Sequence, residues 1–197
     1  MMRMRAAFAA LVLLAAPEAA QAHVVIEGMS GFSGGLLHPL LVPAHILALL
    51  GGGLMAGCQS RRDGIALIAI FAGSLGVASG LVATAYAAQE PGLVLLAATA
   101  IAGLGAAYGR PLPLPASAIV VGLVAIALLL DSVPAVPSRA ETMLALSGTA
   151  LTAIALFAFV TMLSVAARPG WPRTGIRIAG SWCAASALLV LVAQLAR

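Results

Sequence analysis

The stretch LPASAIVVGLVAIALLL, residues 114–130, decides the fold class. It carries no charged side chain, and it is long enough to cross a bilayer, which takes roughly 17–25 residues of helix. The rest of the chain has the same character, because 62% of its residues are hydrophobic and only 8% are charged. Soluble domains have roughly 45–50% apolar and about 25% charged residues. The composition therefore indicates a membrane protein and excludes a soluble globular domain, a nucleic-acid binder and a disordered chain.

Further apolar stretches lie on both sides of this one, separated by polar or proline-rich breaks. Together they predict an all-α membrane protein, a compact bundle of six transmembrane helices at residues 36–57, 64–87, 92–109, 114–130, 142–167 and 175–196. Six spans leave no room for a sizeable domain outside the membrane. The function should therefore lie within the helices or their short loops.

A signal peptide is predicted at residues 1–22. Two arginines precede the short apolar run 6–16, and Ala20-Gln21-Ala22 has the small-x-small pattern of a cleavage site. This divides the chain into a signal peptide, 1–22, and a six-helix transmembrane domain, 23–197. An uncleaved signal anchor is the alternative.

The remaining arginines predict the orientation in the membrane. If the mature N-terminus is periplasmic, two of them face outside, Arg139 and Arg197, and six face the cytoplasm: Arg61, Arg62, Arg110, Arg168, Arg173 and Arg177. Cytoplasmic loops are enriched in basic residues, so this bias agrees with the signal peptide. We expect a protein of the bacterial inner membrane, surrounded by lipid.

Small residues are frequent in the second and third spans. Gly76-x-x-x-Gly80 and Gly105-x-x-x-Gly109 each place two glycines on one helix face. Such faces allow neighbouring helix backbones to approach closely. We expect them to contribute to the packing of the bundle.

The chemistry is concentrated between residues 23 and 45. All three histidines of the chain, His23, His38 and His45, lie there together with Glu27 and Met29. Imidazole, carboxylate and thioether groups bind divalent transition metals. Ionisable groups inside a membrane are functional candidates by default. The cluster predicts a metal site formed by His38, His45, His23 and Glu27.

The spacing of His38 and His45 sets a geometric condition on that site. On a straight helix their positions are about 10.5 Å apart along the axis, too far to hold one ion. Pro39 and Pro43 disfavour a continuous helix, and they would permit a kinked or re-entrant start that brings both rings together. The alternative is that both histidines are buried or interfacial residues, hydrogen-bonded to their neighbours.

The same region resembles a known family. Ala22-His23, the run Gly31-Phe32-Ser33-Gly34-Gly35-Leu36-Leu37-His38-Pro39-Leu40 and His45-Ile46-Leu47-Ala48 are similar to the opening of the HupE/UreJ proteins. These are small bacterial membrane proteins associated with nickel supply to hydrogenase and urease. The resemblance extends to the signal peptide, the six-span layout and the last helix, but its specific part is Ala22–Gly53. It implies a metal ion as substrate, nickel first, with cobalt as an alternative. Copper is a further alternative from the residues themselves, because a site with few carboxylates and a nearby thioether, Met29, favours a softer ion.

The chain departs from the family pattern at several expected ligand positions. Where the family has G-x-D-H, this sequence has Val42-Pro43-Ala44-His45, so the carboxylate beside the second histidine is missing. The His-rich turn after the fourth span is also missing, because residues 131–141 contain no histidine. Asp131 and Glu141 are the carboxylates which that loop offers instead.

Two functions follow as hypotheses. The first is an uptake permease or facilitator that captures a divalent metal through the histidine cluster and passes it to the cytoplasm. The second is a non-transporting membrane subunit or assembly factor on the same scaffold, with a membrane-protein partner or as a homo-oligomer. The sequence offers no paired carboxylates, nucleophile elbow or phosphate loop, so we expect no enzyme.

Overall fold

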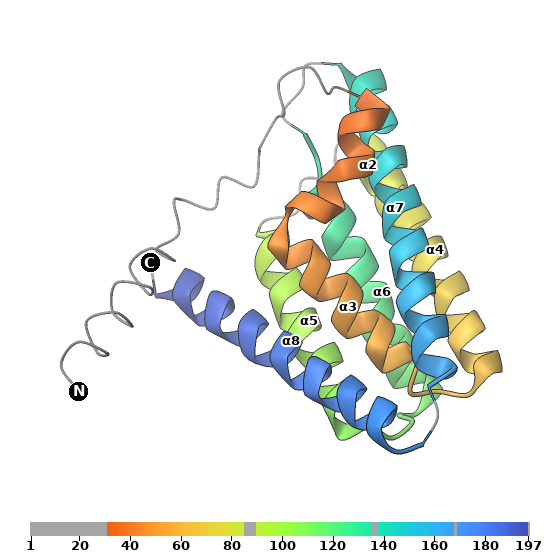
Figure 1. Cartoon of the computed structure of the whole chain (residues 1–197). Coiled ribbons are helices and arrows are strands. Elements are labelled where there is room, and N and C mark those ends of the chain that lie inside the picture. The colour runs from red at the N-terminus through yellow and green to blue at the C-terminus, as the bar shows by residue number, and fades with distance from the viewer. Residues whose placement is uncertain (1–30, 85–89, 135–137, 168, 197) are drawn as a thin grey trace.

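The computed structural model describes residues 31–84, 90–134, 138–167 and 169–196. These residues form helices and no strand (Figure 1): α2 (Gly31–Leu41), α3 (Pro43–Ala56), α4 (Arg61–Ala83), α5 (Pro91–Tyr108), α6 (Leu114–Asp131), α7 (Arg139–Val165) and α8 (Trp171–Leu195). The helices α4 to α8 are each long and apolar enough to cross a membrane, and α2 with α3 forms one further, bent candidate. The predicted all-helical membrane fold is confirmed. The predicted signal peptide, residues 1–22, lies outside the described residues.

Local sequence signals account for where the helices begin. Ser60 and Ser138 precede α4 and α7, and each side chain accepts a hydrogen bond from the backbone N–H three residues later, of Asp63 and Glu141 respectively. Serine is a preferred residue at this position because it pairs a backbone donor that the helix leaves open. The other long helices and α3 carry a proline in their first two positions, where the missing N–H costs no helical bond.

The first span is broken rather than straight. α2 and α3 meet at Val42 with a bend of 71°. The cause is local, because Val42 precedes Pro43 and has an extended backbone (φ −93°, ψ 111°), as is usual for a residue before proline. Within α2, Pro39 has no N–H to donate to the carbonyl of Gly35. The hydroxyl of Thr149 on α7 donates to that carbonyl instead, at 3.1 Å. Thr152 on α7 bonds the next carbonyl, of Leu36, at 2.8 Å, so α7 holds the bent segment in place.

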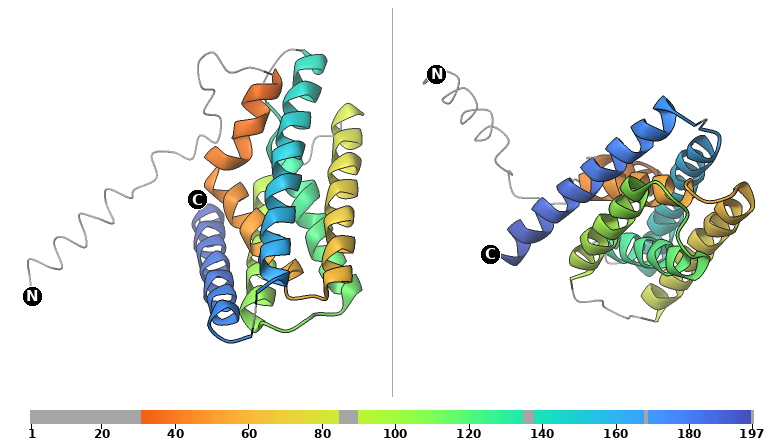
Figure 2. Two further views of the ribbon diagram at one scale, coloured as in Figure 1. Left: turned by 45° about the vertical axis from the view of Figure 1, so that its right-hand side comes forward. Right: turned by 90° about the horizontal axis from the view of Figure 1, so that it is seen from below.

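Glycines bring α2 close to α7. An added Cβ on Gly35 would lie 1.9 Å from the carbonyl oxygen of Ala145, and one on Gly148 would lie 2.3 Å from that of Phe32. Only glycines allow two backbones to approach so closely. Figure 2 shows the result, with α2 lying against the first half of α7.

The glycine pairs singled out by the sequence are not the ones that bring backbones together. α5 and α8 cross at Gly103 and Gly180, where an added Cβ would lie within 3 Å of backbone atoms of the other helix. Gly105 lies instead against the side chain of Met55. At Gly76 and Gly80, an added Cβ would meet no packing atom of the described residues within 4 Å, so the expectation that this pair packs against a neighbouring helix of the bundle is wrong there. Spacing alone does not tell which face of a helix turns inward.

Below the helix break, the middle of the bundle is apolar. α3 packs against α5, α6, α7 and α8, and its Leu49 is buried in the core. Phe71 and Phe157 stack nearly parallel beside it, with ring centroids 4.2 Å apart. On the outside, large apolar side chains such as Phe159 and Leu189 are exposed, as expected for a surface that contacts lipid.

The charges separate to the two ends of the bundle. We call one end the arginine end; it comprises the α3–α4, α5–α6 and α7–α8 connections and carries one acidic residue, Asp63, with five arginines: Arg61, Arg62, Arg110, Arg173 and Arg177. We call the other the acidic end; it carries Glu90, Asp131 and Glu141 together with Arg139. In Figure 1 the arginine end is at the bottom.

Candidate metal centre

His38 and His45 lie on either side of the helix break. His38 is in the last turn of α2, and His45 is in the first turn of α3. Their ring centroids are 5.1 Å apart, and the ring planes are inclined by 64°. The bend that Pro39 and Pro43 were expected to permit is therefore present. It brings together two imidazoles that a straight helix would hold about 10.5 Å apart along its axis.

A carboxylate from a distant part of the chain reaches His45. The Nε2 atom of His45 lies 3.0 Å from the Oδ2 atom of Asp131, the last residue of α6. The His45 side chain is fully buried, and that of Asp131 is 23% exposed. The carboxylate that the sequence lacks at Ala44 is thus supplied by another helix.

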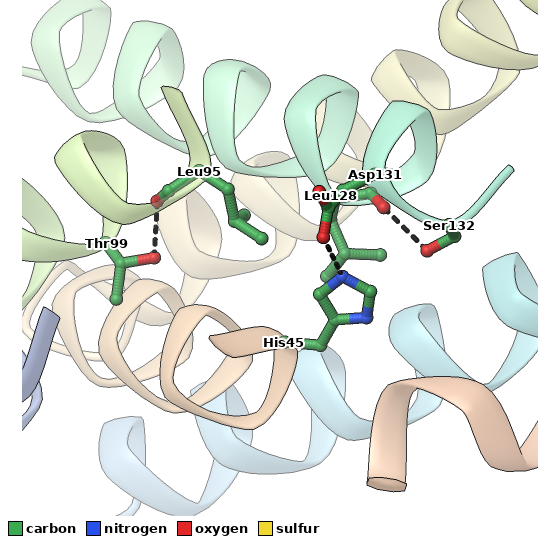
Figure 3. A network of polar contacts seen from close by, with 6 residues as sticks. All are labelled: His45, Leu95, Thr99, Leu128, Asp131 and Ser132. Atoms are coloured by element: carbon green, nitrogen blue, oxygen red, sulfur yellow. Dashed lines mark hydrogen bonds and ion pairs between the residues drawn. The ribbon is translucent and has the colours of Figure 1, made fainter. Parts of the chain in front are cut away.

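The second ring nitrogen of His45 has a different environment. Nδ1 is buried, and no atom of the described residues hydrogen-bonds it. Figure 3 shows the ring with Nε2 directed at Asp131 and the other nitrogen turned away from α6. A buried polar atom without a partner is uncommon and needs an explanation.

The nearby hydroxyls are already used by their own helices. Ser132 donates to the carbonyl of Leu128 at 2.7 Å, and Thr99 donates to that of Leu95 at 2.7 Å (Figure 3). This back-bonding is common for hydroxyls in membrane helices. These hydroxyls therefore have no hydrogen left to donate to the histidine pair.

The first turn of α5 lies beside Asp131. An added Cβ on Gly92 would lie 3.1 Å from the Oδ1 atom of Asp131, so a glycine leaves room for the carboxylate there. The beginning of a helix carries a partial positive charge, which favours a neighbouring anion. Asp131 is at the unfavourable C-terminal end of α6, and α5 compensates for this.

The remaining predicted ligands are not part of the described site. His23 and Glu27, like Met29, lie outside the described residues. Glu141 is exposed in the first turn of α7 and pairs through its backbone with Ser138. Within the described ranges, no group of three or more His, Cys, Asp or Glu side chains is arranged to hold a metal ion. The described site is therefore a pair of imidazoles, one of which, His45, is hydrogen-bonded to the carboxylate of Asp131.

The arginine end offers a different kind of polar surface. A hollow there is lined by Gln59, Ser60, Arg61, Met162, Val165, Ala166 and Arg173. The amide of Gln59 donates to the carbonyl of Leu112 and to the hydroxyl of Ser117, at 3.1 and 3.0 Å. The lining contains two guanidinium groups and no carboxylate or imidazole, so it is unsuited to binding a metal cation.

Sequence reasoning identified the two described histidines by their clustering. It named Asp131 only as one of two carboxylates in a distant loop. A signal for Asp131 does exist, since it is an acidic residue directly at the end of an apolar span. Its partner could not be read from the chain, because 86 residues separate it from His45.

Comparison with known protein families gives a match. The sequence model of a family described as "HupE / UreJ protein" matches residues 11–190, which is most of the chain. No curated protein and no solved structure matches.

Proposed function

Because the chain belongs to the HupE/UreJ family, a family associated with nickel and cobalt uptake, we propose that it is a permease or facilitator for a divalent transition metal. Nickel is the first choice of substrate, with cobalt or copper as alternatives. We place it in the bacterial inner membrane with the acidic end towards the periplasm. The ion enters at that end and leaves at the arginine end.

The observation that carries this proposal is the pair of imidazoles at the helix break. Two imidazoles with a 5.1 Å centroid separation lie beside a carboxylate in a chain of which only 8% is charged. Imidazole is a ligand suited to nickel, copper and zinc. Broken helices at membrane depth form the binding sites of many transporters, because the bend exposes polar groups that a straight helix conceals.

Two imidazoles alone are few ligands for a dehydrated ion. We propose that His23 and Glu27, which precede α2 in the chain, complete the site from the acidic end. A mature N-terminal His23 would offer its α-amine as well as its imidazole. This part of the proposal rests on the sequence.

Metal uptake into cells tests the function. We would compare the wild type with His38→Ala, with His45→Gln and with the double variant, for nickel, cobalt, copper and zinc. The His45→Gln change removes the imidazole but keeps an amide able to bond Asp131, so it separates loss of a ligand from loss of the contact between helices. We expect uptake to fall to the level of cells lacking the protein, with unchanged amounts in the membrane. Thr84→Ala, at the exposed end of α4, is the control and should transport normally.

Metal content of the purified protein gives a second readout. In mild detergent, wild-type protein should retain a stoichiometric metal that the double variant loses. Unchanged uptake in the double variant, or no uptake of any of these metals by the wild type, would overturn the permease.

A non-transporting membrane subunit or assembly factor is the second candidate. It is favoured by one observation, namely that the described residues contain no three-ligand metal group. If this candidate is correct, the histidine variants leave metal uptake unchanged. The protein should then copurify with a larger membrane complex.

A further inference from the structure

We propose that Asp131 is a positioning residue that fixes the tautomer of His45. Its carboxylate holds the ring with the proton on Nε2, so the lone pair is on Nδ1. The assignment of Nδ1 as the metal-binding atom rests on the proposed function, whereas the tautomer itself does not.

The first step of the argument is the contact between the two side chains. A carboxylate is an acceptor, and an imidazole nitrogen at hydrogen-bond distance from it must carry the hydrogen. At 3.0 Å from the Oδ2 atom of Asp131, Nε2 of His45 is therefore the donor. In a neutral imidazole only one nitrogen carries a proton, so Nδ1 is left as the acceptor.

The second step is the position of the other nitrogen. His45 has no exposed surface, and its Nδ1 is buried without a hydrogen-bond partner among the described residues. A histidine with a purely structural role would be expected to pair both of its nitrogens in such a place. A buried lone pair that no hydrogen bond occupies is instead available to a metal ion.

The third step is the nearness of a second imidazole. The ring of His38 is 5.1 Å from that of His45, centroid to centroid, on the other side of the helix break. The lone pair of His45 and a second candidate ligand therefore share one small region. Metal-binding histidines commonly give their other ring N–H to a carboxylate, which orients the ring and strengthens it as a ligand.

The fourth step is what surrounds Asp131. The hydroxyl of the next residue, Ser132, is engaged with the carbonyl of Leu128 and does not compete for the carboxylate. The other oxygen, Oδ1, faces the first turn of α5 at Gly92. Asp131, at the end of α6, thus lies next to His45 on α3 and to Gly92 on α5.

Nitrogen NMR of the full chain in lipid bilayers tests the proposal. Protonated and unprotonated imidazole nitrogens give well-separated ¹⁵N resonances, and the chain has three histidines, so the spectrum is simple. The His45 signals are assigned by their loss in His45→Gln. We expect a protonated Nε2 and an unprotonated Nδ1 in the wild type.

Variants of Asp131 test the cause. Asp131→Asn has the same shape but can turn either an oxygen or an NH₂ group to the ring, so both tautomers should appear. Asp131→Glu should restore the single tautomer. Ser132→Ala alters the neighbouring residue, whose hydroxyl bonds only its own helix, and should give the wild-type spectrum.

Addition of Zn²⁺ as a diamagnetic probe separates this proposal from the function. We expect the Nδ1 resonance of His45 to shift while Nε2 stays protonated, and we expect this shift to be lost in His38→Ala, which removes the second imidazole. A wild-type His45 with its proton on Nδ1, or a tautomer that is unchanged in Asp131→Asn, would overturn the positioning role. A tautomer set by Asp131 that does not respond to Zn²⁺ would support that role and overturn His45 as a metal ligand.

Discussion

The buried polar side chains of this protein fall into two groups. Most hydroxyls, such as those of Thr99, Ser132 and Thr161, donate to a carbonyl four residues earlier in their own helix. A few polar side chains instead link different helices, and His45 with Asp131 is one such pair. The hydroxyls were identifiable in the sequence, but their partners were not. Each of these hydroxyls gives its hydrogen to its own helix, so only the lone pairs of its oxygen are left for another group.

Cys58 gives a prediction at the scale of one side chain. Burial raises the pKa of its thiol, and the nearby Arg173 guanidinium offsets only part of that effect. Since the thiolate is the reactive form, we expect Cys58 to react with maleimide far more slowly at neutral pH than an exposed cysteine. The rate should rise as the pH is increased, and mass spectrometry of labelled protein measures it.

A matched comparison for Cys58 is available in the chain. Thr174→Cys places a thiol in an exposed position at the same end of the bundle. Both measurements use a Cys183→Ala background, which removes the other buried thiol. Equal labelling rates of Cys58 and the engineered thiol at neutral pH would contradict the prediction.

The helix break shows what sequence can and cannot predict about an element. Pro39 and Pro43 indicated that the first span could be kinked or re-entrant, because each removes a backbone donor. They did not give the angle of 71° or show that α7 would support the bend. That support comes from Thr149, which the sequence shows as one hydroxyl among many.

Thr149→Val tests how much this support contributes. The variant leaves the carbonyl of Gly35 without its donor, because Pro39 has no N–H to replace it. An unpaired buried carbonyl costs about 1–3 kcal/mol, so the melting temperature in detergent should fall. Thr161→Val is the control on the same helix, since the carbonyl of Phe157 that Thr161 bonds also has a helical N–H partner. The prediction fails if the two variants are destabilised equally.

Glycines in two helices should respond oppositely to alanine. A Cβ on Gly180 would lie 2.6 Å from the Cβ of Ala106 and 2.9 Å from the carbonyl oxygen of Gly103. Forcing α5 and α8 apart should cost about 1–3 kcal/mol. Gly76 has open space instead, so alanine there should be neutral or stabilise the helix by up to about 1 kcal/mol. Thermal unfolding of both variants measures the difference, and a stable Gly180→Ala protein would argue against the close crossing.

At the scale of the whole molecule, the positions of the spans were predictable and their arrangement was not. The predicted span 114–130 corresponds to α6, Leu114–Asp131, and the four spans predicted at 64–87, 92–109, 142–167 and 175–196 agree with α4, α5, α7 and α8 to within a few residues. The predicted first span, 36–57, is instead two helices, α2 and α3, which begin at Gly31 and are separated by a bend. Apolar length is a property of one stretch of chain, so sequence alone reveals it. Which helices pack together depends on faces that meet across long separations. The contact of His45 with Asp131 joins distant segments, so the sequence alone does not reveal it. The clustering of the histidines is local, so the sequence does.

The segregation of charge predicts how the molecule is oriented. Basic residues are retained on the cytoplasmic side, so the arginine end should face the cytoplasm. A cysteine introduced at Thr84, exposed at the acidic end, should react with a membrane-impermeant maleimide on intact spheroplasts. Thr174→Cys at the arginine end should react only after the membrane is opened. The reverse pattern would invert the proposed direction of transport.

His38 and His45 are close in the sequence but lie on two helices whose packing partners differ in part. α2 is fastened to α7 by Thr149 and Thr152, whereas α3 is embedded among α5, α6, α7 and α8. A change in the angle between α2 and α3 would carry His38 away from His45 without unwinding either helix. An ion bound by both rings would hold α2 and α3 at the present angle. By thermodynamic linkage, the factor by which the changed angle weakens binding of the ion equals the factor by which bound ion disfavours the changed angle. Release of the ion and the change of angle would therefore be coupled.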